Sequence, residues 1–312
     1  MPRILSTVLV LGLLTGTAAA FALTEGLKLE KTPVLGTQVG KVFSPRCGKG
    51  CRTRRVRIFF RLRKPETLTV TIERGHTPIR TLLSRQHRRR GPVQLFWDGR
   101  DSAGRVQRDG TYVPVVHLGR SHRTIRLPNP IELDTRPAVV ESASVRPLVF
   151  SPDGDGHADR IVVRYRFDED AHAILLVNGK RRAFTNGQKP EDKVEWNGRL
   201  DGRTLAPGVY EVTVAARDRA GNRGEAKAAG RVQVRYLTLG RSTIRVAAGA
   251  RFGLRVSTDA PEVRWLLHGR TNTARRGTIK LRAPAMPGRY TLFVTIPSGH
   301  AARATVIVRP KP

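Results

Sequence analysis

Three carboxylates stand close together in the segment FSPDGDGHAD, residues 150–159. Asp153, Asp155 and Asp159 occupy positions i, i+2 and i+6, and a glycine comes directly after each of the first two. Calcium takes six to eight oxygen ligands, and closely spaced aspartates with glycines suit a loop that wraps an ion. The segment is not an EF-hand, because Arg164 stands where that motif needs its bidentate glutamate. It predicts a metal site of a different, partial kind.

Two interpretations of this loop stay open. In the first, the three aspartates bind a structural calcium ion, and backbone carbonyls or Asp201 and Asp218 complete the shell. In the second, the segment is an Asp/Gly turn that leads into a strand, and each aspartate bonds its own backbone.

The segment FSPRCGKGC, residues 43–51, opens with the same three residues but carries thiols in place of carboxylates. Cys47 and Cys51 are the only cysteines of the chain. In an oxidising compartment a lone pair is expected to form a disulfide. Two thiols are too few for a structural zinc site, which needs four ligands. We therefore expect one loop in two copies of a domain, closed by a disulfide in the first copy and by calcium or Asx turns in the second.

The densest basic run, RQHRRR at residues 85–90, contains Arg85, Arg88, Arg89 and Arg90. One interpretation is a hairpin tip that contacts a phosphate-rich polymer or lipid headgroups. The other is a solvated loop, and the lack of interleaved aromatic residues argues against base stacking.

The motifs of common enzymes are missing from the sequence. The eight histidines are scattered, with no H-E-x-x-H spacing, and there is no G-x-S-x-G segment and no phosphate-cradling glycine loop. A triad assembled only in space needs no such motif. In a chain of small β units, however, we expect no enzyme and no cofactor besides the structural calcium considered above.

Charge is distributed unevenly along the 312 residues, whose formal net charge is +32. Residues 42–130 hold 21 Lys/Arg against 5 Asp/Glu, residues 137–236 hold 17 against 14, and residues 237–312 hold 14 against 2. The first and last parts therefore attract polyanions, unless the charge is simply solvated.

The amino-terminal segment points to export. Twenty uncharged residues, 4–23, come after Arg3, and small residues at 18–22 offer cleavage sites. The run also has the length of an uncleaved membrane anchor. Both interpretations of residues 1–24 place the rest of the chain outside the cytoplasm, in the cell envelope or secreted. The expected partners are an anionic cell-envelope polymer, the membrane surface or an envelope protein, and nucleic acid is not expected.

An internal repeat organises the chain. Trp97-Asp-Gly matches Trp196-Asn-Gly. Gly104-Arg matches Gly202-Arg, and Gly110-Thr-Tyr112 matches Gly208-Val-Tyr210, both at an offset of 98. Residues 56–62 and 161–167 alternate apolar and polar side chains with period two, which predicts strands with one buried face. Short predicted strands continue from residue 242 to residue 308, where Pro287-Gly-Arg-Tyr290 repeats part of the motif without the Trp-Asp-Gly turn.

These motifs, with the strand ending in AARDRAGN at 215–222, resemble the Ig-like domain of the flagellar hook-capping protein FlgD. The resemblance covers residues 42–125 and 149–236 and implies a non-catalytic β-sandwich used as a spacer, scaffold or binding surface. It implies no hook capping, since an export segment stands where flagellar members have an assembly region.

The sequence thus predicts an all-β protein of three tandem Ig-like β-sandwich domains after an apolar export or anchor helix. The expected boundaries are 1–24 for the signal or anchor, 42–128 and 146–236 for the FlgD-like domains, 129–145 for the linker, and 237–312 for the third domain. The expected function is structural or adhesive binding to an anionic envelope polymer or a surface partner. The alternative is a scaffold subunit of a surface or flagellum-related assembly that binds protein by strand addition.

Overall fold

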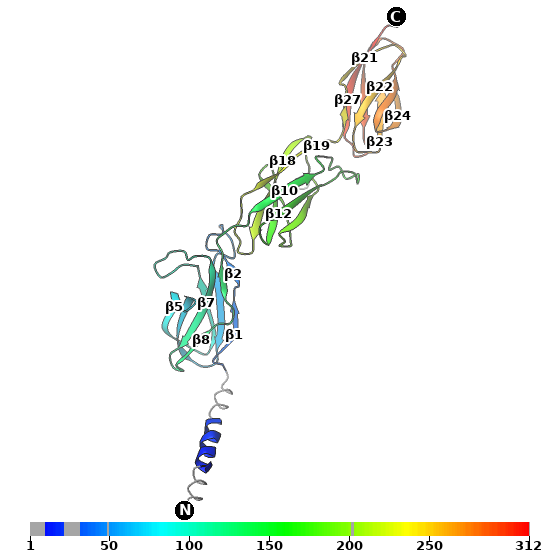
Figure 1. The fold of residues 1–312 in the computed structure, drawn as a ribbon. Helices are drawn as coiled ribbons and strands as arrows, with labels where there is room; N and C mark the ends of the chain where they lie inside the picture. The colour runs from blue at the N-terminus through cyan, green and yellow to red at the C-terminus, as the bar shows by residue number, and fades with distance from the viewer. Residues whose placement is uncertain (1–9, 22–31, 49, 201–202, 312) are drawn as a thin grey trace, which may run out of the picture. The chain divides into compact units, whose positions relative to one another are not determined.

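The computed structural model describes residues 10–21, 32–48, 50–200, 203–311 and no others. Apart from a helix at 10–21, its regular elements are all β-strands (Figure 1). The chain divides into two compact units, Met1–Pro45 with Arg52–Asp134, and Arg46–Cys51 with Thr135–Pro312.

The first sandwich pairs a three-stranded sheet with a larger one. The small sheet has the order β1-β3-β6, and the large sheet has the order β2-β9-β7-β4-β5 with β8 beside β7. The strands are β1 (Val34–Val39), β2 (Val42–Phe43), β3 (Val56–Leu62), β4 (Glu66–Arg74), β5 (Thr77–Arg88), β6 (Gly91–Trp97), β7 (Gly110–Leu118), β8 (Arg123–Arg126) and β9 (Ile131–Leu133).

The second sandwich repeats this arrangement with sheets β10-β12-β15 and β11-β19-β18-β13-β14. Its strands are β10 (Val140–Arg146), β11 (Val149–Phe150), β12 (Ile161–Phe167), β13 (Ala171–Val177), β14 (Lys180–Phe184), β15 (Glu191–Trp196), β18 (Gly208–Asp218) and β19 (Lys227–Val234). A small hairpin, β16 (Arg199–Leu200) with β17 (Arg203–Thr204), is added.

The third sandwich has sheets β20-β22-β25 and β21-β27-β26-β23-β24. Its strands are β20 (Thr238–Leu239), β21 (Thr243–Ala247), β22 (Arg251–Ser257), β23 (Glu262–Leu267), β24 (Arg270–Arg275), β25 (Gly277–Arg282), β26 (Gly288–Thr295) and β27 (Ala301–Arg309). All three copies share one strand order, each with a short parallel pair at one edge: β2 with β9, β11 with β19, and β21 with β27. This pairing makes them immunoglobulin-like sandwiches.

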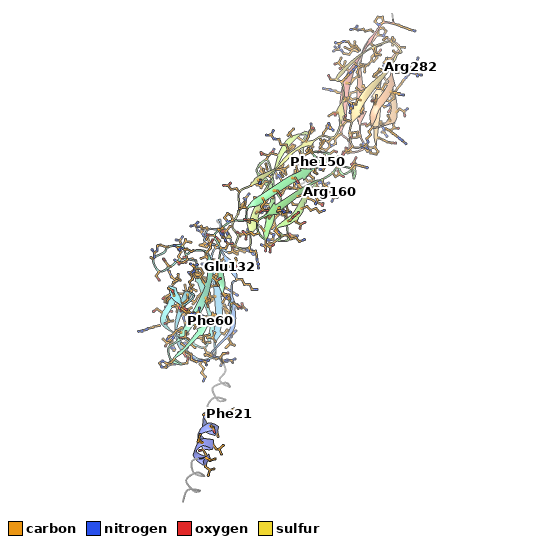
Figure 2. The ribbon with its side chains drawn as sticks, viewed as in Figure 1. Phe21, Phe60, Glu132, Phe150, Arg160 and Arg282 are labelled. Atoms are coloured by element: carbon orange, nitrogen blue, oxygen red, sulfur yellow. A yellow bond between two sulfur atoms is a disulfide. The ribbon has the colours of Figure 1, made fainter. Side chains whose placement is uncertain are left out.

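The period-two pattern of the sequence explains which faces are buried. In β3 and β12 every second side chain points inward, as the alternation predicted. Phe60 and Phe150 lie in the cores of the first and second sandwiches (Figure 2). One buried cluster belongs to the first sandwich, and a second cluster runs through both the second and third sandwiches.

The repeated motif is a packing unit. In the first sandwich Phe43 packs on Trp97 with ring centroids 5.3 Å apart, and the Trp97 indole donates a hydrogen bond to the Arg100 carbonyl at 2.9 Å. In the second, Phe150 packs on Trp196 at 6.3 Å. The Phe-Ser-Pro segment therefore recurs because its phenylalanine ring packs on the tryptophan of the turn.

The tyrosine of the motif is anchored in the same way in all three sandwiches. The hydroxyls of Tyr112, Tyr210 and Tyr290 each donate a hydrogen bond to the carbonyl four residues earlier, at 2.7, 2.9 and 2.9 Å. The third sandwich keeps this feature although it lacks the Trp-Asp-Gly turn.

The expected connector at 129–145 contains two strands. β9 pairs with β7 in the first sandwich, and β10 pairs with β12 in the second. The first sandwich also includes β1, which precedes the boundary expected at residue 42. Only 134–139 separates β9 from β10.

The export segment lies partly outside the described residues, which omit 1–9 and 22–31. Residues 10–21 form a helix whose large apolar side chains, such as Leu13 and Phe21, are exposed. Among the described residues, no helix has the length and apolar character needed to span a bilayer.

Candidate functional site

The two Phe-Ser-Pro loops have a common base. The Ser44 amide donates a hydrogen bond to the Thr53 carbonyl, and the Ser151 amide donates one to the Ala158 carbonyl. Both serines are buried. In the first loop Cys47 and Cys51 form the predicted disulfide.

The second loop is shaped by Asp159 rather than by a disulfide. One Asp159 oxygen accepts a hydrogen bond from the Gly154 amide at 2.6 Å, and the other accepts one from the Gly156 amide at 2.7 Å. Both glycines have positive φ angles, 85° and 87°, which glycine adopts without a steric penalty. Asp159 therefore closes the turn with both of its oxygens.

Asp153 and Asp155, the other two predicted ligands, lie beside an aspartate from the third sandwich. One oxygen each of Asp153, Asp155 and Asp259 lies within 4.8 Å of the others. Asp159 is not in this group. The structure thus brings together two of the three predicted metal ligands and adds a third that is distant in sequence.

Each carboxylate in this group has one oxygen held and one oxygen without a partner. Ser298 Oγ donates to Asp153 Oδ2 at 2.8 Å, the His157 amide donates to Asp155 Oδ1 at 2.8 Å, and Ser151 Oγ donates to Asp259 Oδ2. The remaining oxygens are buried and accept no hydrogen bond; they are Asp153 Oδ1, Asp155 Oδ2 and Asp259 Oδ1.

The surroundings of Asp153 disfavour its charged form. Burial raises the pKa of Asp153, and the neighbouring Asp155 and Asp259 carboxylates raise it further. The Ser298 hydroxyl and the Asp155 backbone amide act in the opposite direction and lower it. A basic side chain, His157, lies beside the group, with its Nδ1 3.7 Å from Asp155 Oδ1. That contact reaches the oxygen already held by a backbone amide.

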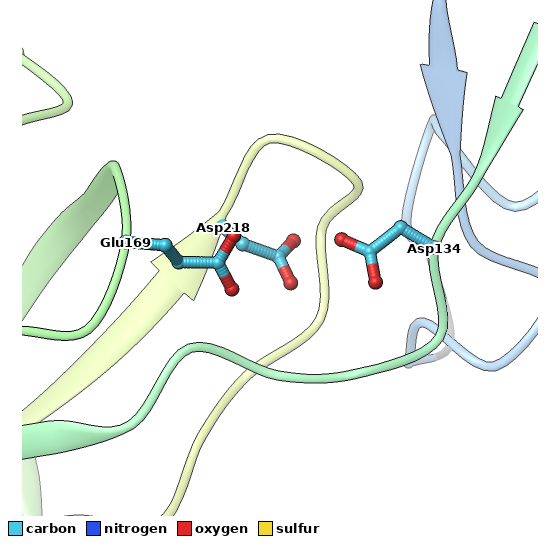
Figure 3. A group of neighbouring side chains, drawn as sticks. All are labelled: Asp134, Glu169 and Asp218. Carbon is cyan, nitrogen blue, oxygen red and sulfur yellow. The ribbon is translucent and has the colours of Figure 1, made fainter. Parts of the chain in front are cut away.

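Of the two alternative ligands, Asp218 does not belong to this acidic group. Asp201 lies outside the described residues. Asp218 ends β18 and lies near Glu169, which precedes β13 (Figure 3). Both Asp218 oxygens accept hydrogen bonds from Asn222, from its amide at 2.9 Å and from its side chain at 2.8 Å. Asp218 is thus a turn-forming residue, as Asp101 is in the first sandwich.

The basic run at 85–90 is not a hairpin tip. Arg85 and Arg88 belong to β5, an edge strand of the large sheet, whereas Arg89 and Arg90 connect it to β6 in the small sheet. All four side chains are exposed. The Arg88 guanidinium bonds the Gln86 side chain at 2.9 Å, and the Arg85 amide bonds Thr69 at 3.1 Å.

A second candidate site is the outward face of each three-stranded sheet, which carries different chemistry in each copy. In the second sandwich this face is charge-compensated. Arg166 pairs with Glu191 at 2.7 Å, and Lys193 pairs with Glu195 at 3.0 Å. Its cations are therefore largely neutralised locally.

The corresponding face of the third sandwich is basic and uncompensated. Arg251 lies directly opposite Arg282 across β22 and β25, and Arg255 and Lys280 are exposed on the same face. Like charges that face one another across a sheet repel. Among the described residues of the third sandwich, no ion pair offsets this repulsion, and the Arg282 guanidinium bonds the Gly249 carbonyl at 2.9 Å.

The corresponding face of the first sandwich combines arginines with aromatic rings. The Arg55 guanidinium lies 4.5 Å from the Phe96 ring centroid, and that of Arg57 lies 5.6 Å from the Phe59 centroid. Arg57 and Phe96 are cross-strand partners, and Phe96 is 42% exposed. The repeated fold therefore presents two basic faces and one neutral face.

Several histidines have structural contacts. His172 Nδ1 lies 2.8 Å from the Thr185 carbonyl, His117 Nδ1 lies 2.9 Å from Thr124 Oγ1, and His300 stacks on Tyr236 with centroids 3.8 Å apart. None of these three belongs to either acidic group that could hold an ion.

Comparison with known proteins finds solved structures that share little sequence identity with the chain. No family model matches the chain, and no curated protein sequence matches it. The fibronectin(III)-like modules of Clostridium thermocellum CbhA share 15% identity over 64% of this chain and 93% of that one, with a TM-score of 0.34. The Bacteroides ovatus mixed-linkage glucan utilization locus protein SGBP-B, solved with a heptasaccharide, shares 14% over 88% and 71%, with a TM-score of 0.23.

A fragment of intimin, solved with the intimin-binding domain of its translocated receptor, shares 13% identity. The match covers 55% of this chain and 64% of that one, with a TM-score of 0.27. Similarities this low do not bear on what the chain binds. The sandwich architecture rests on the strand pairing of the chain itself.

Proposed function

We propose that the chain is a non-catalytic, extracytoplasmic protein whose immunoglobulin-like sandwiches bind an anionic polymer of the cell envelope. The observation that carries the proposal is the outward face of β22 and β25, where Arg251, Arg255, Lys280 and Arg282 have no carboxylate partner among the described residues. A folded protein maintains such repulsion at a cost in stability, and a bound polyanion relieves it.

The N-terminal apolar segment supports export, either as a cleaved signal or as an anchor. The repeated tryptophan, glycine and tyrosine motif supports membership of the FlgD-type Ig-like family. Under this proposal the basic run at Arg85, Arg88, Arg89 and Arg90 adds to the charge of the first sandwich.

The test compares two equivalent faces with the same number of charges removed. The variant R251S/R255S/K280S removes three cations from the uncompensated face, and R160S/R166S/K193S removes three ion-paired cations from the second sandwich. At about 1 kcal/mol for each basic residue near an anionic surface, the loss of three cations should weaken binding by roughly a hundredfold at low salt. Binding to immobilised heparin and to polyphosphate distinguishes sulfate- and carboxylate-bearing glycans from phosphate polymers.

The control triple variant should bind within about threefold of the wild type, since its cations are paired with local carboxylates. Binding should also collapse between low and high ionic strength, because exposed charges are screened. Equal loss in both variants, or binding that resists salt, would contradict the proposal.

The second candidate function is protein binding by strand addition at β24. This strand pairs only with β23 and forms an open edge of its sheet, and five of its six residues are exposed. An unpaired edge offers backbone donors and acceptors to an extended peptide. A partner bound there should be retained at high salt, and the triple variants should leave it unaffected.

A further inference from the structure

The aspartate loop of the second sandwich is bound to the third sandwich, with which it shares one compact unit. Asp153 accepts a hydrogen bond from Ser298, and Asp259 accepts one from Ser151, so the contact is reciprocal. Tyr236 and His300 stack in nearly parallel planes, 9° apart, and the Tyr236 hydroxyl is held by the Leu205 carbonyl at 2.6 Å. The loop therefore lies at a junction.

Three carboxylates at this junction converge although the chain has a large surplus of cations. Residues 237–312 contain only two acidic residues, and one of them, Asp259, lies beside Asp153 and Asp155. Arg276 contacts Asp259, but its guanidinium bonds the Asp259 backbone carbonyl, at 3.0 Å. Among the described residues, the Asp259 carboxylate itself forms no ion pair.

The hydrogen bonds at the junction divide the oxygens into two sets. One oxygen of each carboxylate is held by a hydroxyl or an amide, and the other is buried with no donor among the described residues. Carboxylates that bind metal ions are themselves held by hydrogen bonds. Here a donor fixes one oxygen of each carboxylate, and the other oxygen of the same carboxylate is available to an ion. Without a bound ion, each buried oxygen that accepts no hydrogen bond would have lost its hydrating water without any replacement, which destabilises the folded state.

We propose that Asp153, Asp155 and Asp259 bind one calcium ion, which ties the second sandwich to the third. All the available ligand atoms are oxygens, which calcium and magnesium both accept. Calcium tolerates irregular geometry and high coordination, whereas magnesium demands a near-ideal octahedron at short distances. Ligands from a glycine-rich turn and from a separate sandwich favour calcium. This inference does not depend on polyanion binding.

Asp159 has a different role here from the one that its spacing suggested. Both of its oxygens accept glycine amides, so it sets the turn that presents Asp153 and Asp155. The ligand that replaces it comes from the turn before β23.

The experiment measures calcium binding by the full chain after removal of metal with a chelator and dialysis. Isothermal titration with calcium chloride should give one site in the wild type. Asp259→Asn should weaken calcium binding at that site at least about tenfold, because it removes a direct ligand. Loss of a residue that only hydrogen-bonds a metal ligand already lowers metal affinity by about tenfold. Glu262→Gln, the same charge change at the other acidic residue of the third sandwich, should bind as the wild type does.

Hydrogen exchange locates the effect. Calcium should slow exchange in peptides covering 151–159, 257–262 and 296–300 of the wild type, and leave them unchanged in Asp259→Asn. Asp155→Asn is a second variant, for the case in which Asp259→Asn fails to fold. No calcium binding up to millimolar concentration, equal affinity for magnesium, or wild-type binding by a folded Asp259→Asn or Asp155→Asn protein would overturn the assignment.

Discussion

At the scale of single residues, Glu66 is a buried carboxylate of the first sandwich with a complete set of donors. It accepts hydrogen bonds from the Arg120 amide at 2.7 Å, the Thr67 amide at 3.0 Å and the Ser121 hydroxyl at 2.9 Å. Burial raises the pKa of Glu66, but these hydrogen bonds outweigh burial and hold its pKa below the usual value. The stabilisation is therefore present above the unfolded-state pKa, and it is lost as pH falls through the lower, folded-state value.

Glu66→Gln should lower the free energy of unfolding at pH 7 by about 1.5–3 kcal/mol, the range for hydrogen bonds to a charged group. The difference from the wild type should shrink as the medium is acidified below the ordinary glutamate pKa. Hydrogen exchange of peptides from β4 and β7 measures this locally. A difference that stays constant with pH would contradict the assigned cause.

Gly198 is constrained both by its backbone and by its neighbours. Its φ is 66°, and an added Cβ would lie 2.6 Å from Pro152 and 2.9 Å from the Phe150 ring. Gly198→Ala should therefore cost about 2–4 kcal/mol, from backbone strain together with overpacking. Gly179→Ala is the control, because its φ of 73° imposes the same strain in open space, at about 1–2 kcal/mol. Urea unfolding measures both, and equal costs would show that packing on Pro152 is unimportant.

A contact between two side chains can be predicted from the sequence only where the two residues are close together along the chain. The Cys47–Cys51 disulfide could be expected in a chain with two cysteines four residues apart. Asp259 could not be predicted as a neighbour of Asp155, because no spacing rule connects positions 104 residues apart; the fold alone brings them together.

At the scale of elements, alternation identifies strands with one buried face but not strands without one. β23 and β26 conform to the predicted pattern, whereas β24 is polar and almost wholly exposed, so no pattern predicts it. The connector predicted at 129–145 contains β9 and β10, which are short or rich in polar residues. Edge strands carry little hydrophobic signal, so their pairing depends on the rest of the sheet.

The hydrogen bond from the motif tyrosine to the carbonyl four residues earlier contributes to the free energy of unfolding, and this contribution can be measured. Tyr210→Phe removes only the hydroxyl that bonds the Ala206 carbonyl, and the ring packing remains. Because the bond is partly exposed, the loss should be about 0.5–1.5 kcal/mol. Tyr290→Phe should cost a similar amount in the third sandwich. Urea unfolding gives both values, and a loss above about 3 kcal/mol would mean that the hydroxyl has a further role.

At the scale of the whole molecule, the buried clusters predict how the chain unfolds. The cluster of the first sandwich shares no residue with the cluster that runs through the second and third sandwiches. We therefore expect two calorimetric transitions rather than three, because each continuous core melts as one cooperative unit.

Calcium should act on only one of these transitions. A ligand that binds the folded state stabilises it by about 2.7 kcal/mol at a hundred times its dissociation constant. The transition of the second and third sandwiches should therefore rise in temperature with calcium and fall with chelator. The transition of the first sandwich, whose core cluster shares no residue with the other, should not move. Glu66→Gln identifies the first transition by shifting it alone. Three transitions would show that the second and third sandwiches melt independently, and a calcium shift shared by both transitions would place the ion elsewhere.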